Sequence, residues 1–234
     1  MSSARVVDVG SLDVNGSLRD VCPSHFAYCG VDMCDGKGVD VVLDNPYGLP
    51  FESESIDIIV CSSCLEHSNL FWVLFLEMLR ILKPEGLLYV NAPSNGQVHR
   101  YPLDCWRFYP DAGIALVEWA ETRGYSPALL ESFIGDQRSG PGGFWNDFVA
   151  VFIKDKKHSD AYPARIMNQW SLFCNGRLLG ADAEIKPCEM SEDMTQIEAL
   201  RQQLTEKDLQ LAAILNSKSW KIVNSLRWIR RLLP

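Results

Sequence analysis

Apolar residues in the first 155 positions form short runs that polar turns separate, with two longer amphipathic stretches between them. Short runs rich in β-branched residues are typical of buried strands, and longer stretches with one apolar side indicate helices. The pattern predicts strands over residues 5–10, 26–32, 39–43, 56–61, 86–91, 128–134 and 147–153. It predicts helices over Asn69–Leu82, capped by Ser68 or Asn69 and stopped by Pro84 and Gly86, and over Asp111–Thr122, capped by Asp111.

The alternation of strands with helices predicts an α/β fold, with a mainly parallel sheet covered on both faces. The link at residues 33–38 is too short for a helical crossover, which takes about a dozen residues, so we expect an extended connection there. The last two predicted strands flank a glycine-rich loop, Gly135–Asn146, and resemble a hairpin.

The rest of the chain has a different character. Residues 156–190 are mixed and polar and predict an irregular arm or linker after a domain at residues 1–155. Residues 191–234 predict a helical, basic tail, in which Ile197, Leu200, Leu204, Leu211 and Leu215 fall near heptad positions. A coiled coil and an ordinary amphipathic helix are both compatible with so short a repeat.

The charge is uneven along the chain. The net charge of −8 argues against a general nucleic-acid binder. Residues 218–234 nevertheless hold five basic residues and no acid. With Trp220 and Trp228, this segment could lie in a membrane interface beside anionic lipid, or dock on the acidic body of its own chain.

The start of the chain and its cysteines suggest a cytoplasmic protein. The N-terminus lacks the apolar core of a signal peptide, and the longest apolar run, Leu70–Leu76, is too short to cross a membrane. We therefore expect eight reduced cysteines. Cys61 and Cys64 have CxxC spacing, but a second ligand pair at suitable spacing is missing, so no metal site is expected.

Three positions suggest a nucleotide-type ligand. Gly10 directly follows the first strand, Asp32 ends the second, and Asp44 follows the third. Glycine lets backbone approach a ligand, and an acid about 20 residues later is where such sites hold a ribose. Taken singly, each has a plain alternative, a tight turn or a solvated strand end. Together they lie at the carboxyl ends of strands in one sheet, where ligands of open α/β sheets bind.

The motifs at residues 30–32, 39–44, 49–60, 65–67 and 77–86 (GVD, VDVVLD, LPFESESIDIIV, LEH and EMLRILKPEG) resemble class I S-adenosylmethionine-dependent methyltransferases of the type 11 group. Residues 99–111 (HRYPLDCWRFYPD) resemble a bacterial subgroup. The resemblance covers residues 4–154 and implies a Rossmann-like, seven-stranded sheet with an antiparallel last strand, and S-adenosylmethionine as cofactor. It places Asp8, Gly10 and Ser11 at the methionine end, Asp32 at the ribose, Met33, Asp44 and Asn45 at the adenine, and Ser62 and Ser63 at the sulfonium.

Methylation of a hydroxyl is helped by a base near its proton. His67, beside Glu66, is the first candidate and His99 the second; alternatively, Glu66 and His67 only shape the start of the following helix. The loop at residues 91–110 is rich in groups that suit a sugar or small polar ligand. Its candidate substrate residues are Arg100, Tyr101, Trp106, Arg107 and Tyr109, although a structural corner with Trp106 and Phe108 packed and Arg107 paired to an acid would use the same residues.

The sequence therefore predicts a methyltransferase whose acceptor is a small molecule or a glycan, such as a sugar hydroxyl of a bacterial surface glycan or its precursor. The tail resembles those of proteins from surface-polysaccharide clusters, which suggests a peripheral membrane or polysaccharide-assembly partner through residues 191–234. Because Leu12 replaces a glycine of the first turn, a non-catalytic binding or scaffold module is the alternative. A nicotinamide-dependent oxidoreductase is disfavoured by the same broken glycine turn. The oligomeric state is left open.

Overall fold

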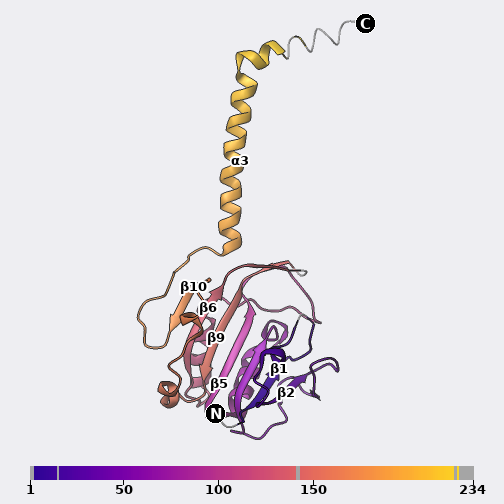
Figure 1. The fold of residues 1–234 in the computed structure, drawn as a ribbon, viewed down its shortest axis with the longest axis vertical. Helices are drawn as coiled ribbons and strands as arrows, with labels where there is room; N and C mark the ends of the chain where they lie inside the picture. The colour runs from indigo at the N-terminus through magenta and orange to yellow at the C-terminus, as the bar shows by residue number, and fades with distance from the viewer. Residues whose placement is uncertain (1–2, 15, 141–142, 224–225, 227–234) are drawn as a thin grey trace. The chain divides into compact units, whose positions relative to one another are not determined.

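The computed structural model describes residues 3–14, 16–140, 143–223 and 226. It divides into two compact units, Met1–Cys188 and Glu189–Pro234. The first unit contains all the strands and the shorter helices, and the second contains one long helix (Figure 1).

The first unit is built on an eight-stranded sheet with the order β10-β6-β9-β5-β4-β1-β2-β3. The pairs β3–β2, β2–β1, β1–β4 and β4–β5 are parallel, whereas β9 runs antiparallel between β5 and β6 (Figure 1). The strands are β1 Arg5–Val9, β2 Ala27–Asp32, β3 Val41–Val42, β4 Ile56–Ser62, β5 Leu82–Pro93, β6 Ala128–Gly135, β9 Asp147–Ile153 and β10 Phe173–Leu178. The predicted fold class, including the antiparallel last strand of the expected seven, is confirmed.

The sheet has one strand more than the sequence predicted. β10 lies in the segment expected to be an irregular arm and pairs antiparallel with the edge of β6. Two short helical turns, η3 (Lys156–Ala161) and η4 (Ile166–Asn168), lie between β9 and β10. A small hairpin, β7 (Arg138–Gly140) with β8 (Gly143–Trp145), forms within the predicted glycine-rich loop, of which residues 141–142 are not described.

The two helices of the first unit differ from their predicted ends. α1 spans Phe71–Ile81 with Leu70 at the N-cap position, so neither Ser68 nor Asn69 caps it. β5 begins directly at Leu82 and takes in Pro84 and Gly86, so these two residues lie inside a strand instead of stopping the helix in a loop. The irregular pairing of β5 with β4 between Leu82 and Leu87 accommodates them.

α2 spans Ala112–Glu121, and Asp111 occupies its N-cap position as predicted. The Asp111 side chain, however, makes no capping hydrogen bond. Its Oδ1 accepts a hydrogen bond from Arg177 of β10 at 2.6 Å instead. The carboxylate therefore joins the extra strand to the start of α2.

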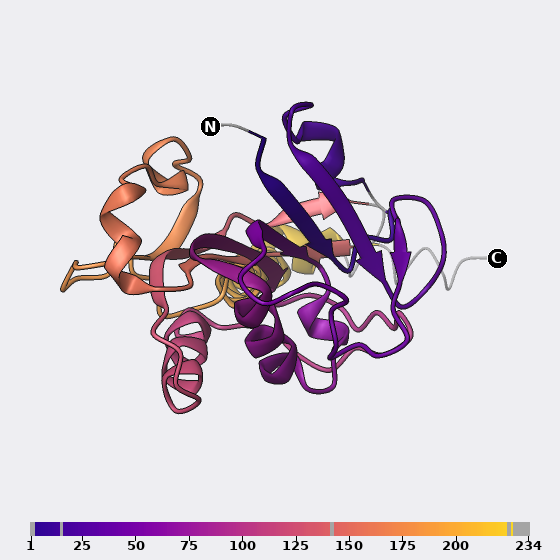
Figure 2. The same ribbon diagram turned by 90° about the horizontal axis from the view of Figure 1, so that it is seen from below.

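The two faces of the sheet are covered in different ways. α1 and α2 lie on the same face and touch, since Trp119 Nε1 donates to the Trp72 carbonyl at 3.0 Å (Figure 2). The other face, over β6 and β9, packs against Tyr162, Ile166 and Met167 of the segment between β9 and β10. The expected cover of helices on both faces is therefore wrong for the described residues, because short turns replace the helices on the second face.

The connections near the N-terminus carry little helix. η1 (Leu18–Val21) is the one helical turn between β1 and β2 in the described part of that link. As predicted, residues 33–40 between β2 and β3 contain no helix. They run back along β2 instead, where Gly30 N donates to Asp40 Oδ2 at 2.7 Å and Asp40 N donates to the Gly30 carbonyl at 2.8 Å.

The second unit contains α3, Glu192–Asn216. None of its side chains is buried, and the predicted heptad residues Ile197, Leu200, Leu204, Leu211 and Leu215 are exposed. Among the described residues, no helix combines the length and the apolar character that a membrane crossing needs. Arg227, Trp228, Arg230 and Arg231 of the predicted basic tail lie outside the described residues.

Candidate active site

The predicted site residues gather at one edge of the sheet. Parallel strands bring their carboxyl ends together, and the order β2-β1-β4-β5 places the ends of four such strands side by side. Gly10 follows β1, Asp32 ends β2, Ser62 ends β4, and the loop with His99 follows β5. Ligands of open α/β sheets bind at this edge.

Gly10 adopts a conformation that other residues avoid. Its φ is +83°, in the left-handed region that favours glycine. A Cβ on Gly10 would lie 2.5 Å from the Cβ of Cys64, which follows β4. The turn after β1 is therefore pressed against the chain that leaves β4, and a side chain at position 10 would separate them.

Ser11 presents a polar atom without a partner. The residue is buried, and its Oγ has no hydrogen-bond partner. Beside it, Leu12 lies against Gly36, where an added Cβ would be 2.4 Å from Leu12 Cδ1. Leu12, at the position of the second glycine in a G-x-G pattern, thus packs against the extended link between β2 and β3.

Asp32 is held at the end of β2 by backbone donors. Its Oδ2 accepts from Leu12 N at 3.2 Å and its Oδ1 from Cys34 N at 2.9 Å. Each carboxylate oxygen has a second lone pair, so both can accept a further hydrogen bond. This geometry fits a carboxylate that binds the two hydroxyls of a ribose.

Asp8, predicted at the methionine end of the cofactor, makes a contact within the sheet. It is buried in β1, and its Oδ2 accepts from the Tyr28 hydroxyl at 2.6 Å. Burial raises the pKa of Asp8, and the Tyr28 hydrogen bond opposes that rise only in part. Burial and the donated hydrogen bond also raise the pKa of Tyr28. In the structure Asp8 therefore joins β1 to β2.

The remaining predicted cofactor residues are more exposed to solvent than Asp8 and Ser11. Met33 and Asp44 are exposed, and Asn45 Oδ1 accepts from Tyr47 N at 2.9 Å in a local turn. Ser63 adopts a positive φ of 50°, and its N–H donates to the Asn91 carbonyl of β5 at 2.9 Å. That turn directs the chain after Ser62 away from the sheet and toward Glu66 and His67.

The eight cysteines all lie in the described residues, and Cys61 and Cys64 are free thiols. Cys61 is buried in β4, and its contact with Cys64 together with burial raises the pKa of the Cys61 thiol. Cys64 packs against Gly10. The CxxC pair therefore lies next to the glycine turn as two thiols.

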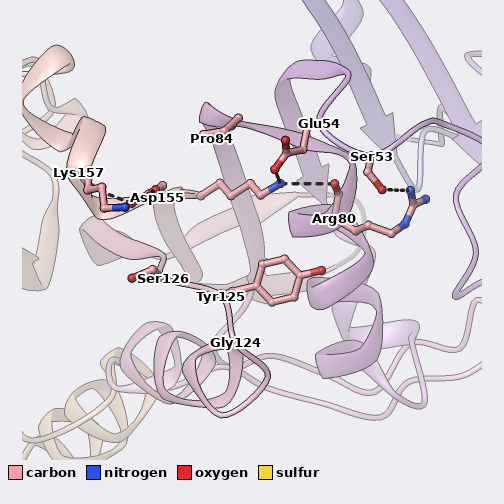
Figure 3. Close-up of a pocket in the computed structure, with 10 residues that line it drawn as sticks. Ser53, Glu54, Arg80, Pro84, Gly124, Tyr125, Ser126, Asp155 and Lys157 are labelled. Atoms are coloured by element: carbon pink, nitrogen blue, oxygen red, sulfur yellow. Dashed lines mark hydrogen bonds and ion pairs between the residues drawn. The ribbon is translucent and has the colours of Figure 1, made fainter.

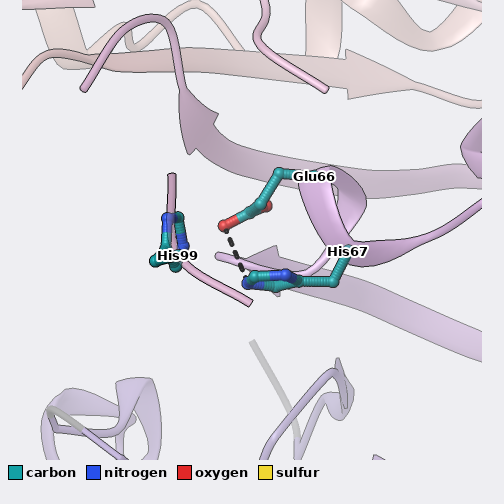
Figure 4. Close-up of side chains that lie close together, drawn as sticks. All are labelled: Glu66, His67 and His99. Carbon is teal, nitrogen blue, oxygen red and sulfur yellow. Dashed lines mark ion pairs between the residues drawn. The ribbon is translucent and has the colours of Figure 1, made fainter. Parts of the chain in front are cut away.

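Glu66, His67 and His99 come together at the carboxyl end of β4 and β5. Glu66 and His67 belong to the short helix η2 (Leu65–His67), and His99 belongs to the loop after β5 (Figure 4). His67 Nε2 lies 3.7 Å from Glu66 Oε1, and the two imidazole rings are 4.9 Å apart, edge to face. Glu66 is 1% exposed, and burial raises its pKa to about 7. Sequence reasoning named both histidines but missed that they meet, because no local spacing links the two loops.

The loop after β5 is anchored by an ion pair. Arg107 donates to both oxygens of Asp104, at 2.6 and 2.9 Å. This bidentate contact holds the pKa of Asp104 well below its usual range. The backbone N–H of His99 also donates to Asp104, at 2.7 Å. Arg107 thus positions His99 through Asp104. The sequence signal for this ion pair is an acid three residues before an arginine.

The other predicted substrate residues divide into two groups. Trp106 packs on the start of α1, where its Nε1 donates to the Ser68 carbonyl at 2.8 Å and its ring meets Phe71 edge to face. Arg100 is exposed, and Tyr101 and Tyr109 are 56% and 68% exposed. Trp145 of β8 lies 5.1 Å from the His99 ring, measured between ring centres.

A cavity of about 570 Å³ lies away from these residues, and none of the predicted site residues lines it (Figure 3). Its walls include Glu54, Arg80 and Lys154, near the start of β5 and the end of β9. Lys154 Nζ donates to the Leu82 carbonyl at 2.7 Å and to Glu54 at 3.1 Å. Because β5 begins here, the cavity belongs to the edge of the sheet opposite the clustered histidines.

The fold agrees with comparisons to known proteins. The family model of a methyltransferase domain, type 11, matches residues 5–90. No curated protein matches the chain in sequence. By this match, residues 5–90 are similar to a methyltransferase domain, and S-adenosylmethionine is the cofactor that the match supports.

Solved structures similar to this one include methyltransferases. An S-adenosylmethionine-dependent methyltransferase from Methanosarcina mazei is 14% identical, with a TM-score of 0.50 over 66% of this chain and 94% of that chain. The 1,6-didemethyltoxoflavin-N1-methyltransferase of Burkholderia thailandensis, solved with S-adenosylhomocysteine, is also 14% identical, with a TM-score of 0.46 over 66% and 72%. At such low identity, the likeness to the Methanosarcina protein establishes the fold.

The residues present fit the cofactor. The unpartnered Ser11 hydroxyl, the backbone of Gly10 and the carboxylate of Asp32 line the edge that a nucleoside with a polar tail would occupy. Asp44 adds an exposed acid beyond β3. Acidic groups suit a ligand that is cationic and rich in hydroxyls.

Proposed function

We propose that this protein methylates a hydroxyl group, with a sugar of a bacterial surface glycan or its precursor as the acceptor class. The observation that carries the proposal is the cluster of Glu66, His67 and His99 beside the end of β4. It lies at the same edge of the sheet as Gly10, Ser11 and Asp32. A proton-accepting group and the proposed cofactor residues therefore lie at one edge of the sheet.

When bound, S-adenosylmethionine supplies a methyl group on a good leaving group, so the protein mainly has to place the acceptor. Placement of this kind is worth about 7–11 kcal/mol in favourable cases. A hydroxyl also loses its proton as it is methylated. His67 offers a basic atom for that proton, because its Nδ1 faces the Leu103 carbonyl and its Nε2 faces the cluster.

Exposed rings and donors in the loop after β5, together with Trp145, support a sugar as the acceptor. Tyr101, Tyr109 and Arg100 are open to solvent, and Trp145 lies against His99. Aromatic faces cover the apolar side of a sugar ring, and charged donors bind its hydroxyls. Trp106 and Arg107 hold the loop that carries Arg100, Tyr101 and Tyr109 through their contacts with Ser68 and Asp104.

Calorimetry tests the cofactor part of the proposal. We expect S-adenosylmethionine to bind the full chain and NAD not to bind. Asp32→Ala should weaken binding at least tenfold, whereas Asp20→Ala, an exposed acid of η1, should leave it unchanged. Equal affinity in both variants would contradict the assignment of Asp32.

Transfer of labelled methyl groups to a panel of sugars and sugar-containing precursors tests the acceptor class. His67→Ala should lower turnover by about 10²–10⁴-fold, the range of general acid–base catalysis, with cofactor affinity unchanged. Turnover equal to the wild type would remove His67 as the base. Labelling of non-sugar acceptors alone would contradict the substrate class.

A second candidate function is a binding or scaffold module without turnover. The contact of Leu12 with Gly36 favours it, because this side chain takes space that a glycine would leave open beside the turn. Absence of heat with both S-adenosylmethionine and NAD would support this alternative. Leu12→Gly would then be expected to create cofactor binding.

The tail is proposed to place the enzyme. Its basic segment and the exposed apolar residues of α3 suit a peripheral membrane site or a polysaccharide-assembly partner. Sedimentation with vesicles that contain anionic lipid, comparing the full chain with one ending at Ser191, tests the membrane form. Equal partitioning of both chains would contradict it.

A further inference from the structure

Three potential metal ligands converge where the sequence predicted no metal site. Glu66, His67 and His99 each offer one ligand atom, and these atoms all lie within 4.8 Å of one another (Figure 4). We propose that these residues bind one divalent transition-metal ion such as Zn²⁺. The site goes beyond the proposed function: an ion on His67 Nε2 would occupy the atom that otherwise accepts the proton, so the two roles are alternatives for that atom. Ion binding can be measured without cofactor or acceptor.

The spacing of the ligands fits an ion with little rearrangement. Bonds from Zn²⁺ to imidazole nitrogen or carboxylate oxygen are about 2.0–2.2 Å, so neighbouring ligands of one ion lie roughly 3–3.5 Å apart. Glu66 Oε1 and His67 Nε2 are already 3.7 Å apart. A small rotation of these side chains would bring both atoms to bonding distance.

Glu66 supplies the independent observation that a ligand is missing. The residue is 1% exposed, and its Oε2 is buried without a hydrogen-bond partner. A buried carboxylate oxygen without a partner is costly, and a bound cation is a common remedy. Figure 4 shows that the Glu66 side chain points toward the two imidazoles rather than away from them.

Both histidines are oriented by acceptors behind them, as metal-binding histidines usually are. His67 Nδ1 contacts the Leu103 carbonyl, which leaves the lone pair on Nε2, the atom next to Glu66. His99 Nδ1 lies 3.4 Å from the Gln97 carbonyl and 3.5 Å from Asp104 Oδ2. With a hydrogen on each Nδ1, both Nε2 atoms are free to bind an ion.

The ligand set also indicates which ions the site selects. Imidazole nitrogens suit Zn²⁺, Cu²⁺, Fe²⁺ and Ni²⁺, whereas Mg²⁺ and Ca²⁺ prefer oxygen ligands. Two imidazoles with one carboxylate leave further coordination positions open. A polar ligand with oxygen atoms could complete the shell.

Equilibrium dialysis of the full chain, first stripped with a chelator, tests the site with Zn²⁺ alone. We expect one tightly bound ion per chain and no comparable binding of Mg²⁺. Glu66→Gln, His67→Ala and His99→Ala should each weaken Zn²⁺ binding at least tenfold. His25→Ala and His158→Ala, which replace exposed histidines outside the cluster, are matched controls and should bind as the wild type does.

Binding of Zn²⁺ by cysteine thiols has to be distinguished from binding at this site, because the chain has free cysteines. Cys64→Ala should keep the ion, and Co²⁺ bound in place of Zn²⁺ should show visible absorption without strong thiolate charge-transfer bands. Circular dichroism and thermal melting verify that the Glu66→Gln variant is folded. No retained ion in the wild type, retention in both histidine variants, or loss in Cys64→Ala would overturn the proposal.

Discussion

At the scale of single residues, buried acids do structural work that sequence reasoning did not assign. Glu131 of β6 is 2% exposed, and its carboxylate accepts from Ile166 N at 2.7 Å and from Met167 N at 3.0 Å. It thereby fastens the segment between β9 and β10 to the second face of the sheet. The strand pattern of β6 gives no hint of this role, because its partners are backbone groups far along the chain.

We predict that Glu131→Ala destabilises the protein by about 1–3 kcal/mol, because it leaves backbone donors without an acceptor. Chemical denaturation measures this change. Glu121→Ala removes an exposed acid at the end of α2 and serves as the control, with an expected change within about 0.5 kcal/mol. Equal effects of the two substitutions would show that the Glu131 contacts contribute nothing.

Comparing Gly10 with Gly124 separates the free-energy cost of backbone strain from the cost of a steric clash. Gly10 and Gly124 have nearly equal φ values, +83° and +84°, but a Cβ would meet Cys64 at Gly10 and nothing within 4 Å at Gly124. Gly124→Ala should cost about 1–2 kcal/mol from backbone strain alone. Gly10→Ala should cost about 1–3 kcal/mol more from overpacking. Unfolding free energies that agree within error would refute the clash.

At the scale of elements, a polar clamp holds the loop before β4 against α1. Arg80 Nη2 donates to the Leu49 and Phe51 carbonyls at 3.1 and 3.0 Å, and Glu77 accepts from Leu49 N at 2.8 Å. Glu77 and Arg80 also pair with each other at 2.7 Å. These residues belong to the motifs that resemble the methyltransferase family, so part of that resemblance reports on folding and not on chemistry.

The clamp predicts a dependence of stability on pH. Burial raises the pKa of Glu77, but hydrogen bonds from Arg80 and Leu49 outweigh this effect and lower it below the ordinary value of 4.5. A lowered pKa in the folded state means that the contribution is complete above pH 4.5 and is lost as the pH falls through the folded pKa.

Glu77→Gln should therefore reduce stability at pH 7 and flatten its fall in acid. Denaturation curves between pH 3 and pH 7 measure both effects. Glu118→Gln, an exposed position of α2, is the matched control. An acid dependence that is unchanged in Glu77→Gln would contradict this account.

The elements differ in how well the sequence predicted them. Strands with β-branched runs, such as Ile56–Ser62, were found within a residue or two. β10 was missed because its sequence, Phe-Cys-Asn-Gly-Arg-Leu, has no alternation, and Asn175 adopts a positive φ of 50°. It becomes a strand through pairing with β6, which is information from outside the segment.

For the candidate site, the sequence predicted which edge of the sheet carries Gly10, Asp32 and Ser62, because parallel topology follows from the alternation of elements. It did not predict that His99 lies against His67. That contact depends on the fold of a loop held by Asp104 and Arg107. Contacts between side chains of two separate loops depend on the folded chain and cannot be predicted from local sequence.

At the scale of the whole molecule, the division into two units has a measurable consequence. α3 has no buried side chain, whereas Cys188 at the end of the first unit donates its N–H to Asn175 Oδ1 at 2.5 Å. We predict that a chain ending at Cys188 melts within about 2 °C of the full chain, since 1 kcal/mol shifts the Tm of a domain this size by about 2–4 °C. A larger fall would show that residues 189–234 stabilise the first unit.

The extra strand β10 also affects how many unpaired backbone groups the edge strands of the sheet expose to other molecules. At one end, β3 has only two residues, Val41 and Val42. At the other, the outer side of β10 is partly paired, because Gly176 and Ile185 exchange backbone hydrogen bonds of 2.8 and 2.7 Å. Long rows of unpaired backbone groups are templates for strand addition and fibril growth. With both ends short or covered, this sheet is a poor seed for aggregation, and concentrated solutions should not enhance thioflavin fluorescence.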